Sequence, residues 1–322
     1  MEDPGGRPPG TRSPRVVALG GGHGLAASLS ALRHVTDHLT AIVTVADNGG
    51  SSGRLRRELG VLPPGDLRMA LAALCRDDEW GRTWADVLQH RFRSNGELHD
   101  HAVGNLLIVA LWELLGEAVE GLDWVGRLLG AQGRVLPMSA VPLDITARVI
   151  GLDPEHPERL TEIRGQAEVA TTDGHVVDVA LDPADPPACP EALVAIAEAD
   201  WVVVGPGSWF TSVIPNLLVP ALCRGLEQTS ARRLLTLNLG EQKGETDGFS
   251  PETHLEVLAA HAPDLRIDVV LADEGHVPDP DSLRRTAHSL GADLVIADIA
   301  DDDQHLHHAP DKLTKVYREL LV

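Results

Sequence analysis

The sequence has few cysteines, few basic residues and no long apolar run, and each shortage excludes a class of protein. The three cysteines, Cys75, Cys189 and Cys223, stand far apart without metal-ligand spacing, which argues against a disulfide framework or a cysteine zinc site. Only 27 lysines and arginines oppose 48 acidic residues, and the formal net charge of −21 repels polynucleotides and anionic lipid surfaces. We therefore expect no nucleic-acid partner. No apolar run approaches the roughly 20 residues of a spanning helix, so we expect no membrane segment.

Residues 1–14 are rich in proline, glycine and arginine and contain no apolar core of a signal peptide. This composition predicts a disordered tail on a cytoplasmic protein. The remainder, residues 15–322, shows neither internal repeats nor low-complexity linkers, and 43% of the whole chain is apolar. We expect it to form a single domain.

The folded part opens with a pattern typical of a strand, a turn and a helix. A short apolar run at 16–19 ends in glycines, apolar residues then recur at helical spacing from Leu25, and a β-branched run follows at 40–46. Right-handed crossover makes the two strands parallel. Further strands are expected at 201–204, 234–239, 267–271 and 294–296, each separated by a helix-length segment. The pattern predicts an α/β fold, a Rossmann-like doubly wound and mostly parallel sheet.

Two segments depart from this alternation. Residues 66–130 are helical in pattern and too apolar in places for surface helices, which indicates a helical insertion that packs internally. From 134 to 181 the period changes to two, with a turn at 173–174, which predicts a small antiparallel excursion. A last helix is expected from about Pro310.

The first glycine-rich turn contains Gly20, Gly21, Gly22, His23 and Gly24. Backbone N–H groups at such a helix start can approach a phosphate, so an acidic chain can still bind a nucleotide. The segment 22–27 also fits G-x-G-x-x-A, with Asp47 at the end of the next strand, as in an NAD-binding fingerprint. A plain tight turn, with glycines that serve close packing, is the alternative.

The second loop combines carboxylate, amide, glycine and hydroxyl groups: Asp47, Asn48, Gly49, Gly50, Ser51 and Ser52. Asp66 is either a plain helix N-cap or, with Asp47, a ligand of Mg²⁺ held against a diphosphate. Residues 49–53 formally fit the G-x-S-x-G nucleophile elbow of hydrolases, but Asp47 and Asn48 separate the serine from the strand.

Two more polar loops follow predicted strands. The first begins with Gly205, Pro206, Gly207 and Ser208 and continues through Thr211, Ser212 and Asn216, which favours a second anion-binding turn. The second contains Asn238, Gly244, Glu245 and Thr246. Because ligands of open α/β sheets sit beyond the carboxyl ends of the strands, we expect these loops to surround one site.

The histidines His99, His101, His305, His307 and His308 suggest a metal at first sight. No spacing pairs them with cysteines or carboxylates in a recognised site. We therefore expect surface histidines and predict no metal site from them.

These loops together resemble the gluconeogenesis-factor family (YvcK-like), within the superfamily of 2-phospho-L-lactate transferase (CofD-like). The motifs that carry the resemblance are VALGGGHGL (17–25), VTVADNGGSSGRLR (43–56), PPGDLR (63–68), HAVGNLL (101–107), GPGSWFTSVIPNLLV (205–219) and GETDG (244–248). The resemblance implies a Rossmann-type regulator that binds UDP-N-acetylglucosamine or a related UDP-sugar. It implies roles in gluconeogenic growth, cell shape and cell-wall synthesis, and places Asn105 of HAVGNLL among the ligand-binding residues.

The resemblance favours a binding protein over an enzyme. A phospho-lactyl transferase acting on a deazaflavin precursor is the alternative, and an NAD(P)-binding protein the second. Cell-wall synthesis proteins are candidate partners, and a homodimer is a candidate oligomeric state. The chain has His23 where the family has threonine, Met69 where it has asparagine, Gly240-Glu241-Gln242 near its Met-Thr-Gln run, and His307-His308-Ala309 where it carries Arg-His-Asp. Loss of that arginine removes a cation that could contact the ligand, which leaves its identity open.

Overall fold

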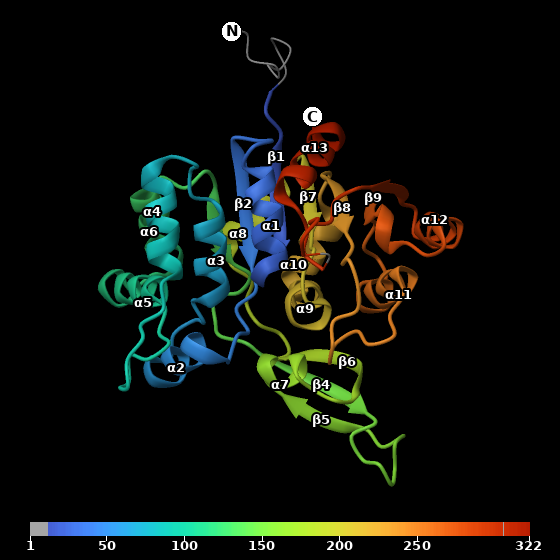
Figure 1. The fold of residues 1–322 in the computed structure, drawn as a ribbon, viewed down its shortest axis with the longest axis horizontal. Coiled ribbons are helices and arrows are strands. Elements are labelled where there is room, and N and C mark those ends of the chain that lie inside the picture. The colour runs from blue at the N-terminus through green and yellow to red at the C-terminus, as the bar shows by residue number, and fades with distance from the viewer. Residues whose placement is uncertain (1–11, 305) are drawn as a thin grey trace.

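A computed structural model of the chain describes residues 12–304 and 306–322. Its centre is a seven-stranded sheet in the order β10-β9-β8-β7-β1-β2-β3, and every neighbouring pair is parallel (Figure 1). The strands are β1 (Arg15–Gly20), β2 (His38–Val43), β3 (Arg134–Pro137), β7 (Trp201–Val204), β8 (Arg232–Thr236), β9 (Val269–Asp273) and β10 (Asp293–Ala297). The strand order reverses between β1 and β7, which is where open α/β sheets bind ligands.

Helices cover both faces of this sheet, which confirms the predicted doubly wound α/β fold. On one face α1 (Gly22–Leu32) packs between α3 (Gly65–Ala73) and α13 (Pro310–Leu321), and on the other α8 (Pro190–Glu198) packs with α10 (Pro220–Gln228) (Figure 1). The fully buried Tyr317 of α13 places its hydroxyl 2.9 Å from Ser28 Oγ and 3.1 Å from Thr236 Oγ1. The last helix is thereby joined to both α1 and β8.

The segment predicted as helical contains α3, α4 (Glu79–Gln89), α5 (Val103–Leu115) and α6 (Ala118–Leu129). One detail of that prediction was wrong, because α3 packs against α1, β2 and β3 instead of only against the other inserted helices.

The second predicted loop is also shorter than expected. Helix α2 (Gly50–Leu59) begins within it, so Ser51 and Ser52 lie in a first helical turn.

The small antiparallel sheet consists of β4 (Asp144–Ile150), β5 (Thr161–Arg164) and β6 (His175–Asp182), with α7 (Gln166–Ala170) between β5 and β6. Figure 1 shows it beyond the carboxyl ends of the main strands. The predicted excursion began too early, because Arg134–Pro137 is β3 of the main sheet. Three consecutive buried residues there, Val135 to Pro137, are typical of a parallel strand covered on both faces.

The remaining elements are a π-helix η1 (Trp209–Val213), α9 (Ile214–Leu218), α11 (Pro251–His261), the 3₁₀ helix η2 (Glu274–His276) and α12 (Pro280–Ser289). Residues 1–11 of the predicted tail lie outside the described residues. Ser13, at the end of that segment, lies 3.0 Å from Thr36 through their hydroxyl oxygens. None of the described helices is both long and apolar enough to cross a membrane.

Candidate functional site

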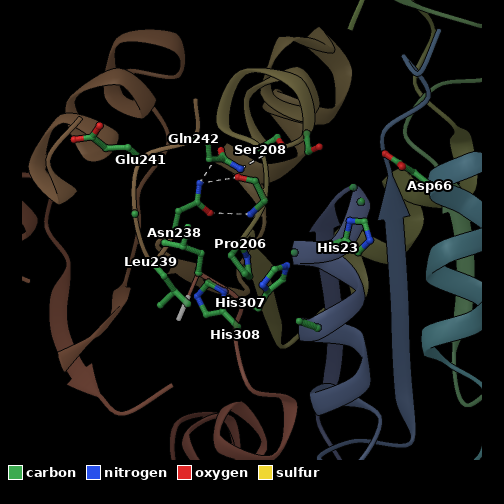
Figure 2. A pocket seen from close by; sticks show the side chains of 18 of the residues that line it. His23, Asp66, Pro206, Ser208, Asn238, Leu239, Glu241, Gln242, His307 and His308 are labelled. Carbon is green, nitrogen blue, oxygen red and sulfur yellow. Dashed lines mark hydrogen bonds between the residues drawn. The ribbon is translucent and has the colours of Figure 1, made fainter. Parts of the chain in front are cut away.

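A cavity of about 470 Å³ lies at the carboxyl ends of β1 and β7. Four segments that are distant in sequence meet around it: the first glycine turn, the 206–208 turn, the 238–242 loop and the segment 306–308 (Figure 2). Its lining residues are Gly21, Gly22, His23, Gly24, Ala27, Asp66, Gln166, Pro206, Gly207, Ser208, Ser212, Asn238, Leu239, Gly240, Glu241, Gln242, Leu306, His307 and His308.

Of the 24 predicted site residues, the structure brings ten to this wall. The other fourteen do not line it, namely Gly20, Asp47 to Ser52, Asn105, Gly205, Thr211, Asn216 and Gly244 to Thr246. Nine lining residues were not among the predicted site residues: Ala27, Gln166, Leu239, Gly240, Glu241, Gln242, Leu306, His307 and His308. Gln166 belongs to the small sheet's helix α7, and no local motif indicates that this helix reaches the cavity.

The two glycine turns touch each other through their backbones. A Cβ atom on Gly24 would lie 2.4 Å from the carbonyl oxygen of Pro206, and one on Gly21 would lie 2.5 Å from Asp66 Oδ2. Contacts below 3.0 Å are not tolerated without displacement. Close packing, one of the two explanations offered for the first turn, is therefore a requirement at Gly24, where the near atoms belong to the backbone of the second turn.

The 205–208 turn is held by Asn238. The Gly207 N–H donates to Asn238 Oδ1 at 3.0 Å, and Asn238 Nδ2 donates to the Gly207 carbonyl at 2.9 Å. This backbone N–H is therefore already engaged, which reduces the number of donors that the predicted anion-binding turn can offer. Gly207 is also buried, with φ +154°, so it is constrained by the fold and not only by ligand access.

The loop at 244–246 braces the π-helix η1 from behind. Glu245 accepts a hydrogen bond from Thr211 Oγ1 at 2.6 Å and from the Phe210 N–H at 3.1 Å, and burial raises the pKa of its carboxyl group. Thr246 Oγ1 accepts from the Gln242 N–H at 2.8 Å. Asn216 similarly donates to Thr44 Oγ1 at 3.1 Å. These polar residues support the cavity wall.

Asn48 links the second loop to the small sheet. Its Oδ1 accepts from the Ala167 N–H at 3.0 Å, and its Nδ2 donates to Glu168 Oε2 at 2.8 Å. Asp47 Oδ1 accepts from the Gly49 N–H at 2.8 Å. The loop thus holds α7 in the position that brings Gln166 to the cavity.

Asp66 is not a helix cap, because α3 starts after Pro64 without a side-chain cap. Burial, and then the negative charge of Asp47, raise the pKa of Asp66 to about 7, against the opposing hydrogen bond from Gly22. Two carboxylates that repel each other favour a shared cation, and oxygen ligands suit Mg²⁺. Within the described residues no cluster of three or more His, Cys, Asp or Glu is arranged around a metal position. Water or ligand oxygens would have to complete the coordination of Mg²⁺.

Ser51 is part of a buried hydrogen-bond network. Its Oγ accepts from Asn105 Nδ2 at 3.0 Å and from the Ala102 N–H at 3.4 Å, and lies 3.0 Å from His101 Nδ1. Only 2% of Ser51 is exposed, and it lies inside α2 instead of on a turn that follows a strand directly. This environment does not fit a nucleophile elbow.

The expectation of surface histidines holds for His99 and His307 but was wrong for His101 and His308, which are 8% and 9% exposed. His101 is bonded to Ser51, and His308 Nε2 donates to the Leu237 carbonyl at 3.1 Å. Burial lowers the pKa of His308 to about 4, so its ring is neutral at physiological pH. His305 lies outside the described residues.

Comparison with known families decides the affiliation. The sequence model of the family described as "2-phospho-L-lactate transferase CofD" matches residues 16–311, which is most of the chain. The chain belongs to the CofD family. The CofD-family match starts at the strand before the first glycine turn and ends in the first turn of α13, so it spans every segment that lines the cavity.

Relatives within this family carry a common name. A Mycobacterium tuberculosis protein named "Putative gluconeogenesis factor" is 55% identical over 304 residues, 94% of this chain and 88% of its own length. A Listeria innocua "Gluconeogenesis factor" is 34% identical over 96% of both chains. A Bacillus halodurans crystal structure described as a member of the UPF0052 family has a TM-score of 0.84 and 32% identity, and covers 97% of this chain and 100% of its own. The resemblance to gluconeogenesis factors within the CofD superfamily is confirmed.

Asn105 of the HAVGNLL motif belongs to the buried hydrogen-bond network of Ser51. It joins Ser51 to Arg68, whose Nε donates to Asn105 Oδ1 at 2.9 Å. Asn105→Ala leaves Arg68 Nε without its partner in the interior and removes one of the three contacts of Ser51 Oγ, so it should lower the free energy of unfolding by about 1–3 kcal/mol. Urea denaturation measures this, with Asn95→Ala on the exposed loop as a control expected within about 0.5 kcal/mol of wild type. Equal losses in the two variants would contradict the supporting role.

Proposed function

We propose that the cavity binds a UDP-sugar of the UDP-N-acetylglucosamine type and that the protein acts as a regulator. One observation supports this most strongly: the glycine-rich ends of β1 and β7 meet at a single cavity that opens at the N-terminus of α1. A helix start with backbone N–H groups favours a diphosphate. We place the diphosphate over the two turns and the remaining groups of the ligand toward the two ends of the cavity.

The two ends differ in chemistry. Asp66 lies at one end, and Leu239 and His308 lie at the other (Figure 2). Hydroxyl and amide groups of a sugar suit the polar end, and a planar base suits the apolar end. Mg²⁺ held by Asp47 and Asp66 would neutralise the diphosphate from the polar side. The proposed biological setting is gluconeogenic growth, cell shape and cell-wall synthesis, in the cytoplasm.

Isothermal titration with UDP-N-acetylglucosamine, NAD and GTP, each with and without Mg²⁺, tests the proposal. We expect the UDP-sugar to bind at least tenfold more tightly than the other two ligands. Stronger binding of NAD would favour a dinucleotide-binding protein. Equal weak binding of all three would remove the support for a nucleotide-sugar regulator.

A transferase is the second candidate, because the CofD family is named for one and because Asp66 combines a raised pKa with a second carboxylate nearby. Incubation with a nucleotide-activated 2-phospho-lactate and a deazaflavin precursor, followed by mass spectrometry, tests it. A phospho-lactyl product in wild type but not in Asp66→Asn would establish the transferase. No product with either protein would leave the regulator as the supported function.

His23 lines the cavity in the first glycine turn, so its side chain can contact the proposed ligand. A phosphate beside the imidazole would accept a hydrogen bond from it, so His23→Ala should weaken binding about fivefold, which is about 1 kcal/mol. His38→Ala, at the end of β2 away from the cavity, should bind like wild type. Titration calorimetry measures both affinities. Equal affinities for wild type and His23→Ala would show that the loop binds through its backbone alone.

A further inference from the structure

His308 lies at the apolar end of the cavity, beside Leu239, and its ring is held in one tautomer (Figure 2). Its Nε2 atom lies 3.1 Å from the carbonyl oxygen of Leu237. A carbonyl oxygen can only accept, so Nε2 carries a proton and donates the hydrogen bond. Burial lowers the pKa of His308 to about 4, and the ring is therefore neutral at physiological pH. In this neutral tautomer Nδ1 carries a lone pair and is a hydrogen-bond acceptor.

The Nδ1 acceptor has no partner of its own. Within residues 12–304 and 306–322, no group donates a hydrogen bond to this atom. Nor is Nδ1 enclosed, because the enclosed side-chain atoms without a partner in these residues are Arg33 Nε, Trp209 Nε1, Asn216 Oδ1 and His254 Nε2. His308 itself is only 9% exposed and lines the cavity. The open acceptor therefore lies at the cavity wall, where a bound molecule can reach it.

The backbone of the neighbouring loop also has unused groups. Leu239 is 3% exposed, yet neither its N–H nor its carbonyl has a hydrogen-bond partner in the part of the chain that the structure describes. The same holds for Gly240. Buried backbone groups are nearly always paired, with protein, with water or with a ligand. Since both residues line the cavity, a bound molecule can supply the missing partners.

The position of His308 is fixed by the protein itself. The Ala309 N–H donates to the Ile299 carbonyl at 2.9 Å. The carboxylate of Asp273, at the buried end of β9, accepts from the N–H groups of Ile299 and Ala300 at 2.8 and 2.9 Å. The ring and the backbone of His308 are therefore both tied to the end of the main sheet, so little ordering of this side chain is needed on binding.

We propose that His308 is a specificity-determining residue, which accepts a hydrogen bond from a ring N–H of the bound nucleobase and so selects uracil over cytosine. This inference rests on the proposed nucleotide site and adds the group that recognises the base. Uracil has an N–H at its N3 position between two carbonyls, whereas cytosine has a lone pair there. That lone pair would face the lone pair of Nδ1, and the buried acceptor would stay unpaired. The N–H groups of Leu239 and Gly240 can donate to the carbonyls of uracil.

Titration calorimetry with UDP, CDP and N3-methyl-UDP tests the inference, because the three probes share the ribose and the diphosphate. CDP lacks the ring N–H, and N3-methyl-UDP carries a methyl group in its place. We expect wild type to bind UDP at least about tenfold more tightly than either of the other two probes. A preference against both of them identifies the ring N–H as the recognised group.

Two variants of His308 separate recognition of the base from stability. Both His308→Phe and His308→Asn lose the Nε2 bond to Leu237, so thermal unfolding should show a lowered midpoint in each. Phenylalanine has no acceptor, and the preference for UDP over CDP should fall to within about threefold. The side-chain oxygen of asparagine is as many bonds from Cα as Nδ1, so a preference of at least about fivefold should remain. His288→Phe, at the exposed end of α12, should bind all three probes like wild type.

Equal binding of UDP, CDP and N3-methyl-UDP by wild type would overturn this role of His308 and leave the nucleotide site standing. A UDP preference that is unchanged in His308→Phe would do the same, because another group would then recognise the base. A preference lost to the same extent in both variants would mean that it depends on packing and not on the acceptor, which also overturns the inference. If wild type binds neither UDP nor UDP-N-acetylglucosamine, the proposed nucleotide site fails, and this inference fails with it.

Discussion

Gly24→Ala is expected to weaken nucleotide binding at least a hundredfold and to lower the thermal midpoint of unfolding. The added Cβ would lie 2.4 Å from the Pro206 oxygen, 2.6 Å from its carbonyl carbon and 2.7 Å from Gly207 Cα. All three are backbone atoms, so the two turns must separate, and with them the backbone N–H groups that we propose to bind the diphosphate. Overpacking of this kind costs about 1–3 kcal/mol. Titration calorimetry and thermal unfolding measure the two effects.

Gly126→Ala is the matched control. Its Cβ would meet no atom closer than 4.0 Å, on a helix remote from the cavity. The variant should bind like wild type and be as stable or slightly more stable, because alanine is favoured over glycine in a helix by about 0.5–1 kcal/mol. Binding by Gly24→Ala within threefold of wild type would show that the separation of the turns does not matter for the ligand.

Asp66→Asn is expected to change how stability depends on pH. The pKa of Asp66 is raised to about 7 in the folded state, so the folded protein binds a proton that the unfolded chain releases near pH 4. Wild type therefore loses stability as pH rises from about 4 to about 7, and the variant lacks that loss. A shift of this size corresponds to about 4 kcal/mol, and because the side chain is only half-buried at the cavity wall we expect a gain of about 1–3 kcal/mol at pH 8.

Urea denaturation at pH 4.5 and pH 8 measures this difference. Near pH 4.5 wild type and Asp66→Asn should be nearly equal in stability, and at pH 8 the variant should be more stable. Asp185→Asn, on an exposed turn, should follow wild type at both values. With Mg²⁺ added at pH 8, wild type should gain stability and Asp66→Asn should not. A variant that is less stable than wild type at pH 8 would contradict the repulsion between Asp47 and Asp66.

The sequence was sufficient for the features that depend on local pattern. Strands followed by glycine turns at 20–24 and 205–208 were predicted correctly, because an apolar run and its terminating glycines are adjacent in the chain. The start of the small sheet was misplaced, since the short strand at 134–137 carries no signal that separates a buried parallel strand from an antiparallel one. Helix α2 was missed because Gly50 and Gly53 disfavour helix, and tertiary packing overrides that preference.

The cavity itself depended on contacts that no local pattern contains. Gln166 reaches it only because Asn48 binds α7, which is a contact across 119 residues in sequence. His101 and His308 became buried because a serine hydroxyl and a backbone carbonyl, far away in the chain, satisfy their ring nitrogens. Composition predicts histidines at a surface, and only the folded arrangement supplies such partners.

The hydrogen bonds of the Tyr317 hydroxyl affect the order in which segments of the chain fold. Ser28 belongs to the helix that starts inside the first glycine turn, and it meets Tyr317 across 289 residues of sequence. Until the polymerising chain has passed that tyrosine, the hydroxyls of Ser28 and Thr236 lack the partner that the finished interior provides. Contacts of such sequence separation form late and slowly. Helix α1 is therefore completed by a segment that lies 289 residues later in the chain, so the interior beside the first glycine turn closes late in folding.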